Sequence, residues 1–229
     1  MIKPKGVRFD IGGTIGSVSA LVLKPKNTTA FLVFAHGAGA GMKHKFMESV
    51  AGRLADRGVG TFRYQFPYME KQIKRPDSEA VLTATVRAAV LEARKHADQL
   101  PLFAGGKSMG GRMTSIAAAA EPLEHVAGLV FFGFPLHAAG KPSATRGEHL
   151  ARINQPMLFL EGTRDALADL RLLKPLCAKI GKRVEVFEIA GGDHSFHMLK
   201  SAGRSDDQVL SEVADKVAAW MKSVQADGK

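Results

Sequence analysis

A serine between two glycines, placed where an apolar segment meets a run of small residues, is the feature that most restricts the fold. Residues 102–111 read LFAGGKSMGG, so Gly106 and Gly110 stand two positions before and two after Ser108. The apolar residues 102–104 predict a buried strand, and the alanine-rich residues 109–120 predict a helix. Glycines beside the serine let a strand and a helix approach closely around a strained turn. We therefore expect a strand–turn–helix unit that presents the Ser108 hydroxyl.

The same residues invite a second interpretation as a nucleotide-binding loop. Gly106, Lys107 and Ser108 match the end of the pattern Gly-x-x-x-x-Gly-Lys-Ser/Thr, in which a loop surrounds phosphate groups. That pattern needs glycine at position 101, where the sequence has Pro101, and the loop residues are expected to form a strand. We therefore expect no nucleotide cofactor.

Short apolar segments alternate along the chain with segments that have the spacing of amphipathic helices. Predicted strands cover residues 7–10, 18–23, 30–35, 60–63, 102–104, 128–132, 157–160 and 183–189. Predicted helices cover residues 46–57, 77–96, 109–120, 165–180 and 205–224. Several strands are apolar throughout, which is typical of strands buried on both faces. The alternation predicts an α/β fold, with a mostly parallel central sheet of about eight strands and helices on both faces.

The connections indicate a simple domain organisation. Residues 11–16 are rich in turn formers, so the first two strands are expected to form a hairpin. Residues 135–155 are the longest irregular segment, and they are too few to fold into a lid domain. A chain of 229 residues fits one domain, so we expect a single domain over residues 1–229.

Composition limits the partners and the compartment. The net charge is +10, but lysine and arginine are spread along the chain without interleaved aromatic residues, so no nucleic-acid partner is expected. No apolar run approaches the roughly 18 residues of a membrane span, and the first residues lack the apolar core of a signal peptide. We therefore expect a cytoplasmic protein without a membrane partner. Cys177 is the single cysteine, which excludes an intrachain disulfide.

A loop of small residues follows a second apolar strand. Residues 36–40 read HGAGA. If Ser108 attacks a carbonyl group, backbone N–H groups must stabilise the oxyanion that forms. In a sheet of this kind one donor is the residue after the nucleophile, here Met109, and the other comes from the loop after the third strand. We expect Ala38 to be that second donor, with Gly39 as the alternative.

Two loops later in the chain carry an acid and a histidine. Asp165 and His194 each stand a few residues after a predicted strand, and the chain order Ser108, Asp165, His194 is the one that this sheet topology requires. His194 would accept the Ser108 proton, and Asp165 would orient the imidazole. Asp193 and Asp169 are alternatives for the acid, although Asp169 is expected to lie within the following helix.

Metal binding is the alternative role for the histidine loop. His194 and His197 have the spacing of a pair of zinc ligands, and Asp193 stands beside them. A loop with two histidines and no carboxylate motif elsewhere is a weak zinc pattern. We expect neither a metal nor a cofactor.

Four segments together resemble a known family. They read HGAGA (residues 36–40), FRYQFPY (62–68), GKSMGGR (106–112) and FGFPLH (132–137). They resemble the dienelactone-hydrolase-related branch of the α/β-hydrolases. More narrowly, they resemble a little-studied family that includes a nonspecific-lethal chromatin-complex subunit and a testis-expressed protein. The resemblance implies the α/β-hydrolase fold over nearly the whole chain. The narrower family implies no substrate. Dienelactone hydrolases carry a cysteine nucleophile where this chain has Ser108, so dienelactone hydrolase activity is not expected.

We expect a serine hydrolase that cleaves a carboxylic ester or a related small acyl compound through an acyl-enzyme on Ser108. The alternative is a non-catalytic interaction protein that keeps the fold. Arg63, at the end of a predicted strand, and Arg112, one helical turn after Ser108, are candidates for binding an anionic group of the substrate. The alternative for both arginines is a bracing role in ion pairs with buried carboxylates, for which Glu161 is a candidate. The sequence predicts no oligomeric state.

Overall fold

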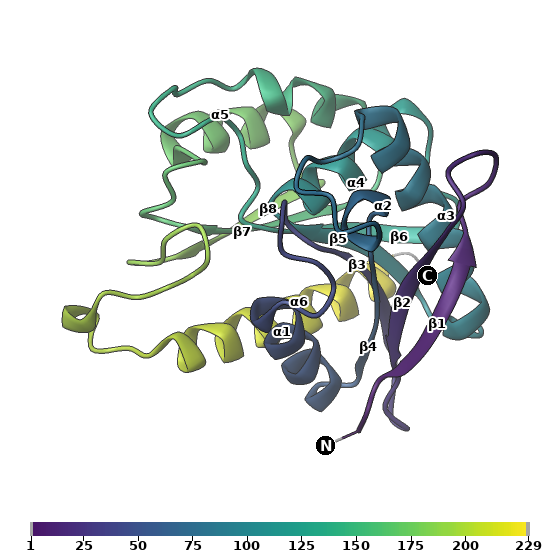
Figure 1. Cartoon of the computed structure of the whole chain (residues 1–229). Coiled ribbons are helices and arrows are strands. Elements are labelled where there is room, and N and C mark those ends of the chain that lie inside the picture. The colour runs from purple at the N-terminus through teal and green to yellow at the C-terminus, as the bar shows by residue number, and fades with distance from the viewer. Residues whose placement is uncertain (1, 228–229) are drawn as a thin grey trace.

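One sheet of eight strands runs through the computed structural model, which describes residues 2–227 (Figure 1). The sheet order is β1-β2-β4-β3-β5-β6-β7-β8. The strands are β1 (Lys5–Asp10), β2 (Ser17–Leu23), β3 (Ala30–Ala35), β4 (Val59–Tyr64), β5 (Leu102–Lys107), β6 (Val126–Phe132), β7 (Met157–Gly162) and β8 (Val184–Ile189). The pairs β1–β2 and β2–β4 are antiparallel, and all pairs from β4 to β8 are parallel. The predicted sheet and its N-terminal hairpin are confirmed.

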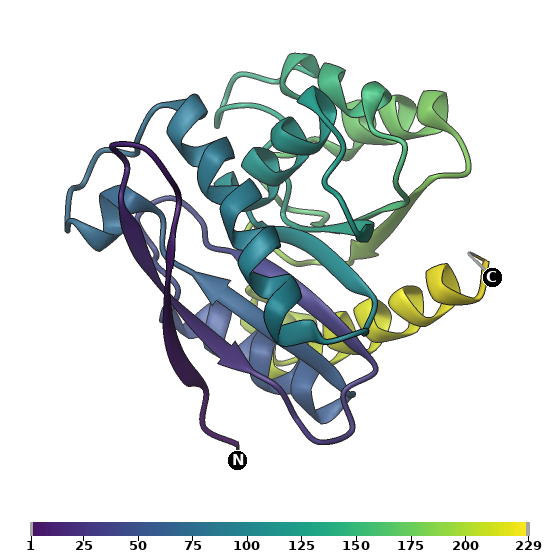
Figure 2. The ribbon, with the colours of Figure 1, turned by 90° about the vertical axis from the view of Figure 1, so that its right-hand side faces the viewer.

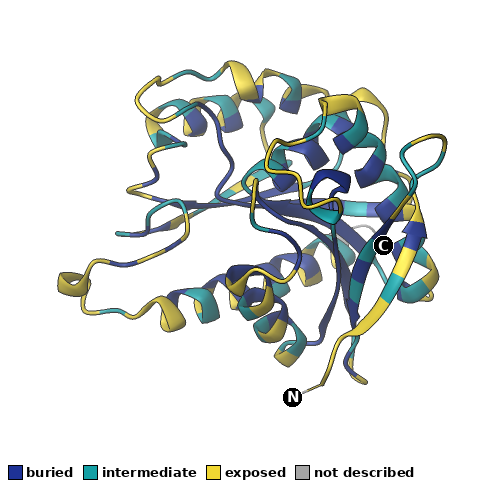
Figure 3. Cartoon of the chain, viewed as in Figure 1, coloured by how far each residue is buried: buried dark blue, intermediate teal, exposed yellow. Residues whose placement is uncertain are grey.

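Helices cover both faces of the sheet, as the sequence predicts. The helices α1 (Lys45–Asp56) and α6 (Asp206–Asp227) lie on one face, and α3 (Glu79–Ala97), α4 (Met109–Ala120) and α5 (Leu170–Ile180) lie on the other (Figures 1 and 2). Figure 3 shows the central strands buried, whereas the edge strand β1 and the outer sides of the helices are largely exposed. Within residues 2–227, no helix combines the length and the apolar character needed to cross a membrane.

The two apolar cores come from the alternation of side chains along each strand. All six residues of β3 are buried. Phe31 and Val33 pack on the side of α3 and α4, whereas Leu32 and Phe34 pack on the side of α1 and α6. A strand buried on both faces must be apolar at successive positions, which explains the continuous apolar runs of the sequence.

The structure differs from the predicted elements at a few boundaries. The strand β5 extends to Lys107, because its pairing with β6 continues to the residue before Ser108. The helix α5 begins at Leu170 and not at residue 165, because the Asp169 side chain accepts the Arg171 N–H and caps the helix. The prediction that Asp169 lies within that helix is therefore wrong.

Three short helical elements were not predicted. They are α2 (Pro67–Glu70) and two 3₁₀ helices, η1 (Thr145–Arg152) and η2 (Lys200–Ala202). The helix η1 lies in the segment that was expected to be irregular, and it packs against α4 and α5. This segment therefore lies beside the helical layer, and the prediction of a fold without a lid domain is confirmed.

Close packing at the end of β5 leaves no room for a side chain. A Cβ atom at Gly105 would lie 1.9 Å from the carbonyl oxygen of Val130 on the neighbouring strand β6. By contrast, a Cβ atom at Gly52 in the middle of α1 would meet no atom within 4 Å. Packing against β6 therefore requires glycine at position 105, whereas at position 52 there is room for a larger residue.

Gly105→Ala should lower the free energy of unfolding by about 3 kcal/mol, because β5 and β6 must separate to admit the methyl group. Gly52→Ala, the matched control, should raise the free energy of unfolding by about 0.5–1 kcal/mol, because alanine is the better helix former. Urea denaturation followed by circular dichroism measures both. Two variants of equal stability would contradict the packing argument.

Candidate active site

Ser108 occupies a strained turn between β5 and α4. Its backbone has φ 50° and ψ −119°, which is a rare conformation for a residue with a side chain. A Cβ atom at Gly106 would lie 2.5 Å from the Ala35 carbonyl oxygen, and one at Gly110 would lie 2.5 Å from the His36 carbonyl oxygen. The glycines of the motif thus allow β3 to approach the turn, and the surrounding backbone holds Ser108 in its conformation.

The structure brings together the three residues predicted as a triad. His194 Nε2 lies 2.8 Å from Ser108 Oγ, and His194 Nδ1 lies 2.7 Å from Asp165 Oδ2. A carboxylate only accepts hydrogen bonds, so Nδ1 carries the proton and donates it. Nε2 is then unprotonated and can accept the Ser108 hydroxyl proton. The Asp165 side chain is fully buried, whereas Ser108 and His194 are half-buried and reachable from solvent.

The two rival acids have other partners. Asp193 Oδ1 accepts the N–H groups of Ser195 and His197, and so it shapes the loop that carries His194. Asp169 caps α5 and lies in an exposed ion pair with Arg171. The geometry therefore favours Asp165 as the partner of His194.

The glycine-rich loop after β3 lies beside the serine. A Cβ atom at Gly37 would lie 3.6 Å from the Cβ atom of Ser108. The Gly39 N–H donates to the hydroxyl of Tyr68 at 2.9 Å, so this alternative oxyanion donor already has an acceptor. Met109 is the first residue of α4, where a backbone N–H has no acceptor within the helix. Ala38 and Met109 thus stay the predicted pair of donors.

A buried lysine connects the serine turn to the histidine loop. The ammonium group of Lys107, the residue before Ser108, donates to the His194 carbonyl oxygen at 2.5 Å. It lies 5.7 Å from the ring centroids of both Phe46 and Phe196. Burial lowers the pKa of Lys107 to about 8. No sequence pattern indicates this contact, although Lys107 stands within the Gly-x-Ser-x-Gly motif itself.

A buried glutamate lies behind the acid. Glu161 Oε1 accepts the Phe134 N–H at 2.5 Å, and the side chain is completely buried. Burial, together with the negative charge of Asp165, raises the pKa of Glu161 well above its ordinary value. The suggestion that Glu161 pairs with one of the two candidate arginines is wrong, because those arginines lie beside other carboxylates.

Arg63 lies on the side of the sheet covered by α1. Its guanidinium donates to the Met42 carbonyl oxygen at 3.1 Å and lies 4.0 Å from a carboxylate oxygen of Glu48. Arg63 pairs in the sheet with Phe34, whose side chain also packs on the α1 face. The structure therefore does not bring Arg63 to Ser108, and its contacts indicate the bracing role.

Arg112 lies one helical turn beyond Ser108 on α4. Its guanidinium is 3.6 Å from a carboxylate oxygen of Glu79, and 28% of its side chain is exposed. Burial lowers the pKa of Arg112, and the nearby charge of Arg146 lowers it further. Arg112 is thus a partly exposed cation near the serine turn, with a single carboxylate beside it.

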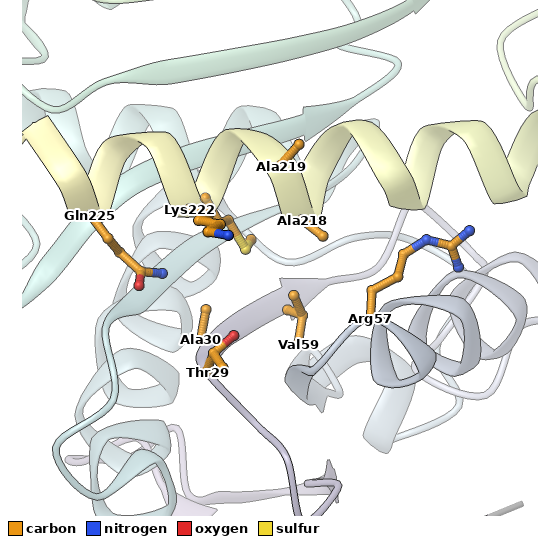
Figure 4. Close-up of a pocket in the computed structure, with 9 residues that line it drawn as sticks. Thr29, Ala30, Arg57, Val59, Ala218, Ala219, Lys222 and Gln225 are labelled. Atoms are coloured by element: carbon orange, nitrogen blue, oxygen red, sulfur yellow. The ribbon is translucent and has the colours of Figure 1, made fainter.

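A hollow of about 490 Å³ lies away from this site (Figure 4). Its lining includes Ala30 and Val59, the first residues of β3 and β4, and Lys222 of α6. Ser108 follows the last residue of the parallel strand β5, so the hollow is at the opposite edge of the sheet. Among residues 2–227, no three His, Cys, Asp or Glu side chains are grouped so that they could share a metal ion.

Solved structures of similar fold include several hydrolases. A dienelactone hydrolase from Anabaena variabilis is 19% identical, with a TM-score of 0.72 and coverage of 97% of this chain and 99% of that chain. A serine hydrolase without a lid from Xanthomonas campestris is 18% identical, with a TM-score of 0.73 and 96% of each chain covered. Est1E from Butyrivibrio proteoclasticus, with ferulic acid bound, is 17% identical, with a TM-score of 0.73 and coverage of 96% and 99%.

These likenesses lie below 25% identity and concern the fold alone. The sequence itself gives the family, because residues 28–222 match the family model described as an alpha/beta hydrolase domain. This match spans most of the chain and includes the serine turn, the acid loop and the histidine loop. The chain belongs to the α/β-hydrolase domain family.

Proposed function

We propose that this chain is a serine hydrolase that cleaves a carboxylic ester or a related small acyl compound through an acyl-enzyme on Ser108. One observation carries the proposal: the two ring nitrogens of His194 lie 2.8 Å from Ser108 Oγ and 2.7 Å from Asp165 Oδ2. Membership of a hydrolase family supports it, and so do the similar structures, which include a serine hydrolase and the esterase domain of a Rhodothermus marinus protein. The narrower resemblance to the family of the chromatin-complex subunit stays a prediction and names no substrate.

The first half-reaction makes the acyl-enzyme. Ser108 Oγ attacks the carbonyl carbon while its proton passes to His194 Nε2. The carbonyl oxygen takes up the electron pair and becomes an oxyanion, which the N–H groups of Met109 and Ala38 would stabilise. The intermediate then expels the alcohol, which takes the proton from His194, and the acyl group stays on Ser108.

The second half-reaction reverses these roles with water. His194 Nε2 takes a proton from water as the water oxygen attacks the acyl carbon, and the same proton returns to Ser108 Oγ as the acid leaves. The imidazolium that forms in each half lies next to Asp165, whose carboxylate is shielded from solvent and stabilises it strongly.

Ser108→Ala should abolish turnover of p-nitrophenyl acetate and labelling by a fluorophosphonate probe, because the attacking oxygen is removed. Ser115→Ala is a matched control, because Ser115 Oγ also lies 2.7 Å from a histidine nitrogen, that of His149. Ser115 is fully buried on α4 and its hydroxyl donates to the Arg112 carbonyl oxygen, so this variant should keep turnover. Turnover by Ser108→Ala at the rate of the parent would refute the role of Ser108. A parent protein that neither turns over the ester nor reacts with the probe would favour the non-catalytic alternative.

Asp165→Asn should lower kcat by about 10³–10⁴-fold, because an amide would hold the imidazole in the wrong tautomer. Asp169→Asn is the control for the rival acid, and it should leave turnover nearly unchanged because asparagine caps a helix as well as aspartate does. Steady-state kinetics with p-nitrophenyl acetate measures both. A large loss of kcat in Asp169→Asn, with normal kcat in Asp165→Asn, would show that Asp169 and not Asp165 is the acid that orients His194.

We further propose that Arg112 binds an anionic group of the substrate. The side chain is partly exposed, lies on the helix that Ser108 precedes, and has the cation Arg146 nearby and one carboxylate at 3.6 Å. A substrate carboxylate would relieve the repulsion between the two arginines. Arg63 is the matched comparison, because its side chain is buried on the opposite face of the sheet.

Arg112→Gln should raise KM at least several-fold for an ester that carries a distal carboxylate, and it should leave KM unchanged for the matched neutral ester. Arg63→Gln should affect the two esters alike and lower the melting temperature. Steady-state kinetics with the pair of esters separates these outcomes. If Arg112→Gln changed KM equally for both esters, Arg112 would have a structural role and would not bind the substrate anion.

A further inference from the structure

Three hydrogen bonds join the oxyanion loop, residues 36–42, to residues 65–68, which follow β4. They run from the Phe66 N–H to His36 Nε2 (3.1 Å), from the Gly39 N–H to Tyr68 Oη (2.9 Å) and from the Met42 N–H to Gln65 Oε1 (2.8 Å). Each bond pairs a backbone N–H with a side chain, so it depends on the identity of that side chain. The loop is therefore fixed by a segment that contributes nothing to the Ser–His–Asp contacts.

The contact region is buried. His36, Phe66 and Tyr68 are each 0% exposed, and the His36 ring meets the Phe66 ring edge-on with centroids 4.9 Å apart. Burial lowers the pKa of His36 to about 4, so the imidazole is neutral at physiological pH. Its Nδ1 lies 2.7 Å from the Gly37 carbonyl oxygen and donates, which leaves Nε2 free to accept the Phe66 N–H.

The backbone of Tyr68 is fixed by contacts outside the oxyanion loop. Its backbone N–H donates to Asp77 Oδ2 at 2.7 Å, and Pro67 starts the short helix α2 with a fixed backbone angle. The phenol side chain is therefore anchored at its base. Its hydroxyl reaches the loop from a rigid position.

The loop needs such support because it is rich in glycine. Gly39 and Gly41 have φ angles of 69° and 74°, in the left-handed region. Glycine gives a chain more freedom than other residues, so the loop has little stiffness of its own. The peptide unit between Ala38 and Gly39 is planar, so a fixed Gly39 N–H also fixes the Ala38 carbonyl group. The Ala38 N–H belongs to the preceding peptide unit, and the contacts of His36, Gly39 and Met42 on either side limit how far that unit can rotate.

We propose that Tyr68 is a positioning residue of the oxyanion site: its hydroxyl accepts the Gly39 N–H and so holds the loop in the conformation in which the Ala38 N–H faces the carbonyl oxygen of an acyl group at Ser108. This inference rests on the proposed function. Tyr68 is buried and acts through the loop, so its effect falls on the oxyanion and not on the bound ester. Removing the hydroxyl should therefore change kcat and leave KM unchanged.

Tyr68→Phe tests the proposal, because it removes the hydroxyl and keeps the buried ring. We expect kcat for p-nitrophenyl acetate to fall about tenfold, which is less than the 10²–10³ lost with a whole oxyanion donor. The affinity for an aryl trifluoromethyl ketone, whose adduct carries an oxyanion, should fall by a similar factor. Tyr64→Phe is the control, since Tyr64 is the other tyrosine of the chain, is equally buried and makes none of the three contacts.

Amide hydrogen exchange of residues 37–42 gives a readout that needs no turnover. Exchange there should quicken in Tyr68→Phe and stay at the wild-type rate in Tyr64→Phe. Unchanged kcat and exchange in Tyr68→Phe, or equal losses in both variants, would overturn the positioning role. A wild-type chain that neither hydrolyses esters nor reacts with a fluorophosphonate would instead refute the proposed function, and the exchange data would still decide whether Tyr68 fixes the loop.

Discussion

Backbone contact at the end of β5 sets the positions of the other parts of the site. Cβ atoms at three glycines would lie within 2.5 Å of carbonyl oxygens on other segments: Gly105 against Val130, Gly106 against Ala35 and Gly110 against His36. The strands β3 and β6 flank β5, so the contacts that place Ser108 also place the start of the loops after those strands. One of these loops carries Ala38, the proposed oxyanion donor, and the other carries Phe134, whose N–H donates to Glu161 Oε1.

Contacts between loops fix those parts of the candidate site that the sheet does not position. A parallel sheet brings the carboxyl ends of its strands to one edge, but it does not fix the loops that extend from them. Lys107 contacts the His194 carbonyl oxygen and so joins the serine turn to the histidine loop. Tyr68 contacts Gly39 and so joins the segment after β4 to the oxyanion loop. Both residues are buried, and in the proposed mechanism neither touches the substrate.

The fold and the three central side chains could be predicted because each depends on a local pattern. Apolar runs gave the strands, and position after a strand end gave Ser108, Asp165 and His194. The two roles considered for Arg63 could not be separated from the sequence, because a strand end predicts closeness to the edge of the sheet but not the face of a side chain, which alternates. The contact of Tyr68 joins segments that are 29 residues apart, so no local pattern contains it.

The burial of Lys107 and Glu161 beside Asp165 and His194 is difficult to explain as a contribution to the stability of the fold. Lys107 and Glu161 are both withdrawn from water, and burial disfavours the charged form of each, as the lowered pKa of the lysine and the raised pKa of the glutamate indicate. Apolar residues of similar size would generally make such a core at least as stable. The two side chains flank Asp165 and His194, where an imidazolium forms and disappears during the proposed reaction. Groups that shape the field and the geometry at that point would serve the proposed acyl transfer.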